Sequence, residues 1–311
     1  MYDNVAFVVS SCDKYEDAWY PYFELVKKYW PNHPSEIVLI TETKQYTTYG
    51  LNIKTYNFPQ DYTWSERLYY TLAQLNTKYI IFSLEDFFLF DHVDDLRILR
   101  CISWMEQNQK IVQCRLIPSS FSQLTPSRKY EDFCFAGDDV PFRLDTQVAI
   151  WNREGFMSFI DLSESPWLFE SKGTTRIIGT DKIFLWYQGS AEKKLIFPYR
   201  LLFQNPMCGI SWGHWLSPTK KLFKDNGING VRYWRLGVLS EKAVKRRLKH
   251  LYNKNPTNFE KLIRPCWLMF AKCRVAVSNV LIFGFKKGMS LNLNKIKSRT
   301  DKIKKCQGDT Q

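Results

Sequence analysis

Strand-like segments alternate with helical patterns over the first 90 residues, and this alternation restricts the fold more than any other feature of the chain. The strand-like segments are short and rich in Val, Ile, Phe or Tyr, and they lie at residues 5–9, 36–40, 53–58 and 79–84. Two segments between them, residues 15–30 and 64–76, place apolar side chains on one helical face. Such alternation predicts an α/β fold with a largely parallel sheet, flanked by helices and buried on both faces.

The fourth strand-like segment ends in two adjacent carboxylates. Residues 79–90 read YIIFSLEDFFLF, so Glu85 and Asp86 stand between apolar residues. Charges in such surroundings are costly unless a partner stabilises them. Ligands of open α/β sheets bind beyond the carboxyl ends of the strands, where adjacent carboxylates can share Mg²⁺ or Mn²⁺ with a phosphate-bearing ligand. The pair therefore predicts a phosphate site with a cation, and the alternative is a structural pair that caps a helix or forms salt bridges.

The middle of the chain continues the α/β pattern less regularly. A helix is expected over residues 93–107 and a strand over residues 111–117. Residues 118–143 show no regular pattern, which in a compact domain is typical of a binding loop. Residues 146–151 alternate like a strand, and a short helix and further short strands are expected from there to about residue 205.

Positive charge is concentrated in the last third of the chain. Residues 215–311 carry 23 Lys and Arg against 5 Asp and Glu, whereas residues 1–214 carry 21 against 26. A basic tail on a weakly acidic body favours an anionic partner, either a membrane surface or nucleic acid. Residues 265–285 are apolar, but Lys272 and Arg274 would each cost about 2.5–3.5 kcal/mol at the centre of a bilayer. We therefore expect a helix that lies in the membrane surface, with a core helix as the alternative.

The cysteines and the first residues of the chain indicate a reducing compartment. The eight cysteines form no CxxC pair, and with four histidines they match no zinc-site spacing. The N-terminus lacks a basic start and reaches acidic residues within a few positions, so no signal peptide is expected. These features predict a cytoplasmic protein with free thiols, associated peripherally with the inner face of the plasma membrane through its basic C-terminal region.

Three short motifs follow one another along the chain, and together they resemble a known family. They read WSERL at residues 64–68, LEDFFL at residues 84–89 and PWLFE at residues 166–170. Bacterial GT-A-type glycosyltransferases of capsule and O-antigen polysaccharide clusters carry similar motifs in the same order. The resemblance covers about residues 4–215. It implies a GT-A-like mixed sheet, with a nucleotide-sugar-binding half at 1–117, an acceptor half at 118–215 and a basic helical extension at 216–311.

The resemblance also implies a donor site for a nucleotide-diphosphate sugar. The loop after the first strand and Glu42 would contact the base and ribose, and Arg67 would reach the phosphates. Asp86, with Glu85 and His214, would hold Mn²⁺ or Mg²⁺ on the diphosphate. The expected donor-binding residues are Ser10, Ser11, Asp13, Glu42, Trp64, Ser65, Arg67, Glu85 and Asp86. The family's Asp-x-Asp motif would place an acid at Leu84, so a site without a metal, in which Arg67 and other cations neutralise the diphosphate, is the alternative.

On the acceptor side, an inverting transfer needs a carboxylate that takes the proton of the attacking hydroxyl. The resemblance implies that Glu170 is this general base, with Asp145 as the alternative. Gln147, Trp151 and Trp167 are the expected acceptor contacts. The acceptor would be a growing surface polysaccharide or a polyprenyl-linked glycan.

Two other functions compete with this interpretation. Sugar-phosphate nucleotidyltransferases share a similar first half, but they usually carry Gly and Arg or Lys in the loop after the first strand, and residues 10–17, SSCDKYED, contain neither Gly nor Arg. A nucleic-acid-binding protein would explain the basic third, but the aromatic residues are spread through the acidic body. The sequence therefore favours a glycosyltransferase without a nucleic-acid partner.

Overall fold

The computed structural model describes residues 1–119, 121, 123–189, 195–199, 208–211, 213–233, 237–240 and 242–243. The chain divides into two compact units, Met1–Lys245 and Arg246–Gln311, and every described residue belongs to the first. This unit continues past residue 215, where the sequence placed the end of the catalytic domain. The apolar stretch 265–285 and the basic tail lie outside the described residues. Within the described part, none of the helices has the length and apolarity that crossing a membrane requires.

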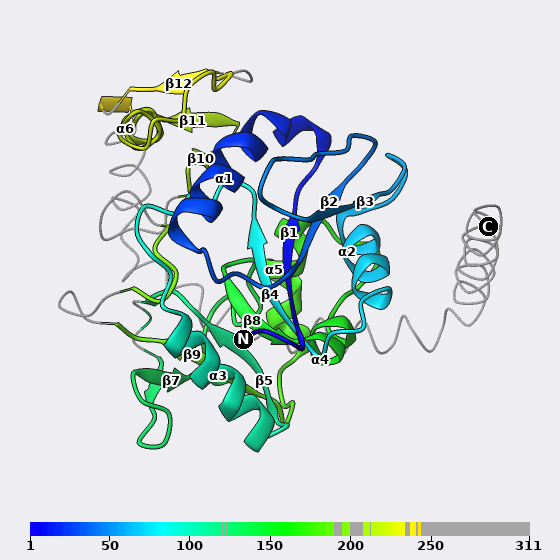
Figure 1. Ribbon diagram of the computed structural model, residues 1–311. Coiled ribbons are helices and arrows are strands. Elements are labelled where there is room, and N and C mark those ends of the chain that lie inside the picture. Colours follow the sequence, from blue (N-terminus) through cyan, green and yellow to red (C-terminus); the bar gives the residue numbers. More distant parts are fainter. Residues whose placement is uncertain are drawn as a thin grey trace. The chain divides into compact units, whose positions relative to one another are not determined.

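A nine-stranded mixed sheet runs through the first unit in the order β3-β2-β1-β4-β8-β5-β9-β7-β6 (Figure 1). Its strands are β1 (Val5–Ser10), β2 (Glu36–Thr41), β3 (Ile53–Asn57), β4 (Tyr79–Leu84), β5 (Ile111–Arg115), β6 (Thr125–Pro126), β7 (Phe133–Phe135), β8 (Ala149–Asn152) and β9 (Ile183–Tyr187). Strands β3, β2, β1 and β4 pair in parallel, as β5 and β9 do, whereas β8 runs antiparallel between β4 and β5. The largely parallel sheet expected from the sequence is confirmed, with β8 reversed in its middle.

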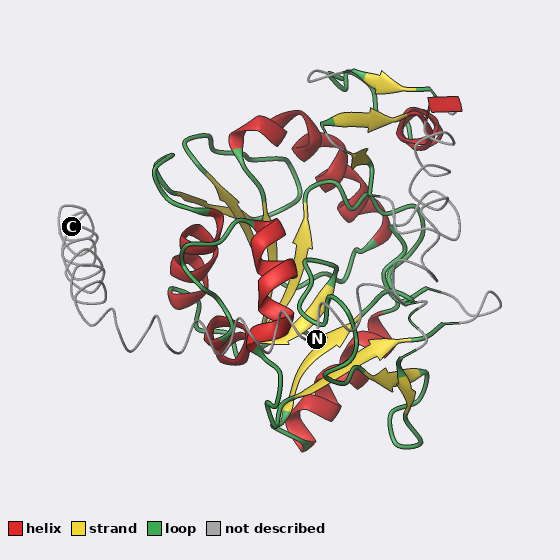
Figure 2. Ribbon diagram, turned by 180° about the vertical axis from the view of Figure 1, so that it is seen from behind, coloured by secondary structure: helices red, strands yellow, loops and turns green. Residues whose placement is uncertain are grey.

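Helices cover both faces of this sheet (Figures 1 and 2). Helices α1 (Glu16–Tyr29) and α3 (Asp95–Gln107) pack on one face, and α2 (Trp64–Ala73), α4 (Arg153–Ser158) and α5 (Pro166–Arg176) pack on the other. Strand β4 shows how the sequence produces two cores, because successive side chains of a strand point to opposite faces. Its Tyr79 and Ile81 enter the core under α1 and α3, and its Ile80 and Phe82 enter the core under α2 and α5.

The N-terminus of α2 is fixed by local hydrogen bonds. Thr63 and Glu66 form a capping box, in which each side chain accepts a hydrogen bond from the other residue's backbone N–H. The Thr63 hydroxyl also donates to the carbonyl of Leu162, just before α5. These contacts hold Trp64 and Arg67, both on the first turns of α2, in fixed positions at the end of the sheet.

A small second sheet follows residue 208. It contains β10 (Ile210–Ser211), β11 (His214–Leu216) and β12 (Val238–Leu239), and helix α6 (Ser217–Asp225) follows β11. Phe88, close after β4, stacks on Trp215 of β11 and meets Phe223 of α6 edge to face. The chain after residue 208 therefore returns to the segment that carries the two adjacent carboxylates, an arrangement that the sequence did not predict.

Candidate active site at the carboxyl edge of the sheet

The carboxyl ends of β1, β2 and β4 meet at one edge of the sheet. Ser10, the last residue of β1, is aligned with Ile40 of β2 on one side and with Leu84 of β4 on the other. The chain continues to β2 and β3 on one side of β1 and to β4 on the other, so this point is a topological switch, where α/β sheets form their ligand crevice. The loops that follow these three strands carry most of the predicted donor-binding residues.

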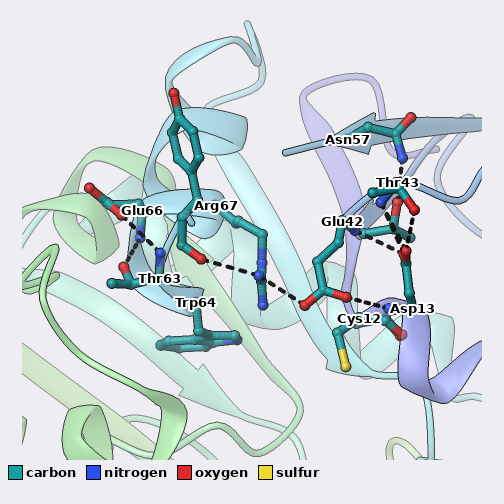
Figure 3. A network of polar contacts seen from close by, with 12 residues as sticks. Cys12, Asp13, Glu42, Thr43, Asn57, Thr63, Trp64, Glu66 and Arg67 are labelled. Carbon is teal, nitrogen blue, oxygen red and sulfur yellow. Dashed lines mark hydrogen bonds and ion pairs between the residues drawn. The ribbon is translucent and has the colours of Figure 1, made fainter. Parts of the chain in front are cut away.

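Two of these loops are joined through Asp13 and Glu42 (Figure 3). The backbone N–H of Asp13 donates to Glu42 Oε2 at 2.8 Å. The Asp13 carboxylate accepts hydrogen bonds from the backbone N–H groups of Glu42, Thr43 and Lys44 at 3.1–3.2 Å, and from the Thr43 hydroxyl. Burial raises the pKa of Asp13, but the hydrogen bonds from Thr43, Lys44 and Glu42 outweigh burial and hold it below its ordinary value. Asp13 was predicted to bind the donor; in the structure its carboxylate oxygens are engaged by the neighbouring loop.

Arg67 reaches the same network from α2. Its Nη1 lies 3.1 Å from Glu42 Oε1, and the two side chains are 10% and 18% exposed. Nη1 also donates to the carbonyl of Tyr62 at 3.3 Å, whereas the buried Nε has no hydrogen-bond partner within the described part of the chain. A guanidinium carries five N–H donors. Arg67 therefore keeps donor capacity for an anion at this edge, while Glu42 fixes its orientation.

Two tryptophans hold the serines at the end of β1. The indole N–H of Trp64 donates to Ser10 Oγ at 2.9 Å, and that of Trp19 donates to Ser11 Oγ at 2.7 Å. The Ser11 hydroxyl also donates to the Cys12 carbonyl at 3.5 Å. A serine oxygen that accepts one indole N–H keeps its hydroxyl hydrogen and a second acceptor site, so Ser10 can still offer its hydroxyl hydrogen to a ligand. Trp64 and Ser65 were also predicted to bind the donor, and for Ser65 this requires correction because the residue is fully buried. Trp64 is largely buried against Phe169 and holds Ser10 through its indole N–H.

Glu85 and Asp86 are the central residues of a tight turn that follows β4, closed by a hydrogen bond from Phe87 N–H to the Leu84 carbonyl. Both are buried, at 6% and 7% exposure. The negative charges of these carboxylates act on two nearby thiols, those of Cys12 and Cys208. Burial, followed by the charges of Glu85 and Glu42, raises the pKa of Cys12 to about 11. Burial is the largest cause that raises the pKa of the Cys208 thiol well above its ordinary value, and the negative charge of Asp86 is the next.

The predicted metal ligands do not form a cluster. His214 lies on β11, where it pairs with Ser211 of β10. Among the residues that the structure describes, no three His, Cys, Asp or Glu side chains are grouped closely enough to hold a metal. The set of Glu85, Asp86 and His214 is therefore not assembled. The carboxylates of Glu85 and Asp86 are hard oxygen ligands of the kind that Mg²⁺ and Mn²⁺ accept, and they suit a site that phosphate oxygens of the donor complete.

The two candidates for a general base, Glu170 and Asp145, both lie at the segment that leads into β8. Glu170 of α5 is partly buried, and its Oε1 accepts hydrogen bonds from the Thr146 N–H at 2.9 Å and the Thr146 hydroxyl at 2.6 Å. Its Oε2 has no hydrogen-bond partner among the described residues. Asp145 lies 3.0 Å from Arg115 Nε in an ion pair of which each side chain is 6% exposed. The Arg115 guanidinium also stacks on the ring of Trp186 at 4.3 Å.

A second contact joins this region to the carboxylate pair. The Tyr199 hydroxyl donates to Gln147 Oε1 at 2.6 Å, and the Tyr199 ring stacks on Phe87 with 4.2 Å between centroids. Since Phe87 directly follows Asp86, Tyr199 and Phe87 link the predicted acceptor residue Gln147 to the turn that carries the predicted donor carboxylates. The sequence analysis did not identify Tyr199 or Arg115, because neither belongs to a motif and their partners are distant along the chain.

The two tryptophans predicted to contact the acceptor differ in exposure. Trp151 of β8 is fully buried and stacks on Phe156 with 4.3 Å between centroids, so no ring face is left for an acceptor and that prediction is wrong. Trp167 lies near the start of α5 and is 72% exposed. Its ring is available for stacking on a sugar, while the next-but-one residue, Phe169, packs on Trp64.

Comparisons with known proteins give distant structural similarities. No family model matches the chain, and no curated protein matches its sequence. Staphylococcus aureus TarS, residues 1–349, is 9% identical with a TM-score of 0.41, over 60% of this chain and 59% of that chain. A mannosyltransferase from Pyrobaculum calidifontis, solved with GDP-Man and Mn²⁺, is 9% identical with a TM-score of 0.37, over 61% and 58%. A cytidylyltransferase from Leptospira borgpetersenii is 9% identical with a TM-score of 0.36, over 60% and 76%.

The chain thus spans about three fifths of the length of the TarS fragment. These TM-scores all lie below 0.5, so the functional assignment depends on the geometry of the site.

Proposed function

We propose that the protein is a glycosyltransferase that moves a sugar from a nucleotide-diphosphate donor to an acceptor hydroxyl. One observation carries this proposal. The serines after β1, Glu42 after β2, Arg67 of α2 and the Glu85–Asp86 pair after β4 converge at the switch point of a parallel sheet. Hydroxyl donors, a carboxylate, a guanidinium and paired acids thus lie at one edge of the sheet, and these are the groups that a ribose and a diphosphate require.

Each donor residue has a role that follows from its contacts. Ser10 presents its hydroxyl hydrogen to an acceptor atom of the nucleoside, with its oxygen held by the Trp64 indole, and Ser11, held by Trp19, lines the same loop. Arg67 directs its remaining donors to the phosphates, and Glu42 orients it. Asp86, with Glu85 beside it, holds Mn²⁺ or Mg²⁺. The cation would neutralise the negative charge that the leaving diphosphate develops.

On the acceptor side, the structure favours Glu170 over Asp145 as the general base. Asp145 is held by a buried arginine at 3.0 Å, and removing a proton from an acceptor would require it to leave that pair. Glu170 is fixed through one oxygen by Thr146, which leaves the other oxygen to accept the hydroxyl proton. Gln147 and the exposed ring of Trp167 would contact the acceptor sugar. In this assignment the reaction inverts the anomeric carbon.

We further infer the acceptor and the location from the sequence. The order of the three motifs is similar to that of enzymes from capsule and O-antigen clusters, so the acceptor would be a growing surface polysaccharide or a polyprenyl-linked glycan. The strongly basic residues 216–311 would attach the protein peripherally to anionic lipid at the cytoplasmic face of the membrane.

A thermal-shift panel tests the donor site. The full-length protein is heated with UDP, GDP, CDP and dTDP, each with Mn²⁺, with Mg²⁺ or with a chelator. A ligand that binds the folded state adds about 2.7 kcal/mol of stability at one hundred times its dissociation constant. Asp86→Ala should lose the cation-dependent part of this gain, and Asp91→Ala, at an exposed aspartate five residues later, should keep it. Absence of stabilisation by every nucleotide would remove the basis of the proposed function.

A further inference from the structure

The turn that carries Glu85 and Asp86 is held from outside by residues 208–210. The backbone N–H of Gly209 donates to the Asp86 carbonyl at 2.8 Å, and the Gly209 carbonyl accepts from the Leu216 N–H at 2.9 Å. Gly209 therefore bridges the acidic turn and strand β11. The neighbouring Cys208 lies against the Asp86 carboxylate, which is among the causes of its raised pKa.

Only glycine fits between these contacts. A Cβ at position 209 would lie 2.2 Å from Phe88 Cδ2 and 2.3 Å from Phe88 Cε2, whereas carbon atoms in contact are about 3.5–4.0 Å apart. It would also lie 3.1 Å from Thr219 Cγ2. The glycine is required here by the close approach of a ring to the backbone, and nothing in the backbone angles demands it.

The Phe88 ring cannot easily yield to such a Cβ. It is fully buried, stacks on Trp215 with 5.8 Å between centroids and an interplanar angle of 9°, and meets Phe223 edge to face at 5.0 Å. Packed interiors respond to an added methyl group by shifting backbone. The two backbones that can shift are that of residue 209 and that of the turn Leu84–Phe87, and either movement displaces Asp86 relative to its hydrogen bond with Gly209.

We propose that Gly209 is a positioning residue for the acidic turn: by binding the Asp86 carbonyl and fitting against Phe88, it sets where the Asp86 carboxylate meets a cation and the donor diphosphate. This rests on the proposed function, since it concerns the same donor site. It makes the second sheet part of the site, although none of its residues need touch the donor. Groups that orient a metal ligand typically change metal affinity about 10–100-fold when they are altered.

The test is Gly209→Ala in the full-length protein, with Mn²⁺ binding measured by electron paramagnetic resonance in the presence of UDP. UDP is replaced by whichever nucleoside diphosphate stabilises the wild type in the panel above. We expect Mn²⁺ affinity to fall about tenfold or more. Gly137→Ala is the matched control, because its Cβ would meet only the exposed side chain of Asp139, at 3.2 Å, and its Mn²⁺ affinity should equal that of the wild type.

A rescue variant separates displacement of Asp86 from general damage. Phe88→Val removes both ring atoms that the new Cβ would strike, Cδ2 and Cε2, so Gly209→Ala combined with Phe88→Val should bind Mn²⁺ as Phe88→Val alone does. If Gly209→Ala fails to fold, as judged by circular dichroism, the double variant decides in the same way.

Wild-type Mn²⁺ affinity in a folded Gly209→Ala protein would overturn the proposal, and so would a double variant that recovers neither folding nor affinity. A wild-type protein that binds no nucleoside diphosphate would instead overturn the proposed function, so the two failures are distinguishable.

Discussion

Replacing Asp13 with alanine should destabilise the protein in a way that depends on pH. The Asp13 carboxylate accepts hydrogen bonds from three consecutive backbone N–H groups, those of Glu42, Thr43 and Lys44, and from the Thr43 hydroxyl. Alanine removes all of these acceptors at once. Hydrogen bonds to a charged group contribute about 1.5–3 kcal/mol each. The group is partly exposed, so water replaces much of the loss, and we expect a total cost of about 2–3 kcal/mol at neutral pH.

The pH dependence follows from the direction of the pKa. Hydrogen bonding holds the pKa of Asp13 in the folded protein below the ordinary aspartate value of 3.8. A carboxylate whose folded-state pKa is lowered contributes stability above its unfolded-state pKa and loses it as the pH falls through the folded-state pKa. The difference in unfolding free energy between wild type and Asp13→Ala should therefore be constant from pH 7 to about 5 and should shrink below about pH 4.

Urea unfolding followed by tryptophan fluorescence at a series of pH values measures this difference. Asp181→Ala is the control, because Asp181 is 65% exposed and forms only a surface ion pair with Lys110, which is worth at most about 1 kcal/mol. A cost of Asp13→Ala that stays the same down to pH 3.5, or one no larger than that of the control, would refute the reasoning. Donor affinity should fall with stability, since Glu42 loses the loop that places it.

Three further outcomes are expected. Glu170→Gln should lower kcat about 10²–10⁴-fold in a transfer assay and leave nucleotide affinity unchanged. A variant with the kcat of the wild type would instead favour Asp145 as the general base. Arg115→Met should cost about 3–5 kcal/mol in urea unfolding, because the buried Asp145 carboxylate loses this ion pair, and a cost below about 1 kcal/mol would contradict that expectation. Truncation after Lys245 should keep folding and nucleotide stabilisation but release the protein from anionic liposomes in a sedimentation assay; unchanged sedimentation would contradict membrane attachment through the tail.

The sequence predicted the first half of the sheet well, because strand length and hydrophobic pattern determine it locally. Strands β1, β2, β3 and β4 and helices α1 and α2 lie where the apolar segments placed them. The strand expected over 146–151 begins at Ala149, since Thr146 and Gln147 instead bind Glu170 and Tyr199. The second sheet was missed, because its strands are two or three residues long and are stabilised by Phe88 and its aromatic neighbours.

The convergence of several candidate residues at one edge of the sheet was predicted from the sequence, but their mutual contacts were not. Motif position was enough to bring Glu42, Arg67 and the acidic pair to one edge of the sheet. It did not reveal that Asp13 is used by a loop, because backbone N–H groups carry no signature in a sequence. The sequence also does not show whether a tryptophan lies in the core or on the surface. In the structure Trp151 is fully buried, whereas Trp167 is mostly exposed.

The reversed direction of β8 has a consequence for altering this protein. A strand that runs against its neighbours brings its first residue, and not its last, to the edge where β4 and β5 end. In the proposed function, the segment that enters β8 would therefore supply the acceptor side, while the donor side would come from segments that leave β1, β2 and β4. Substitutions at the residues directly before β8 would then act on the proposed acceptor side, whereas the last residue of β8, Asn152, lies at the opposite end of the strands.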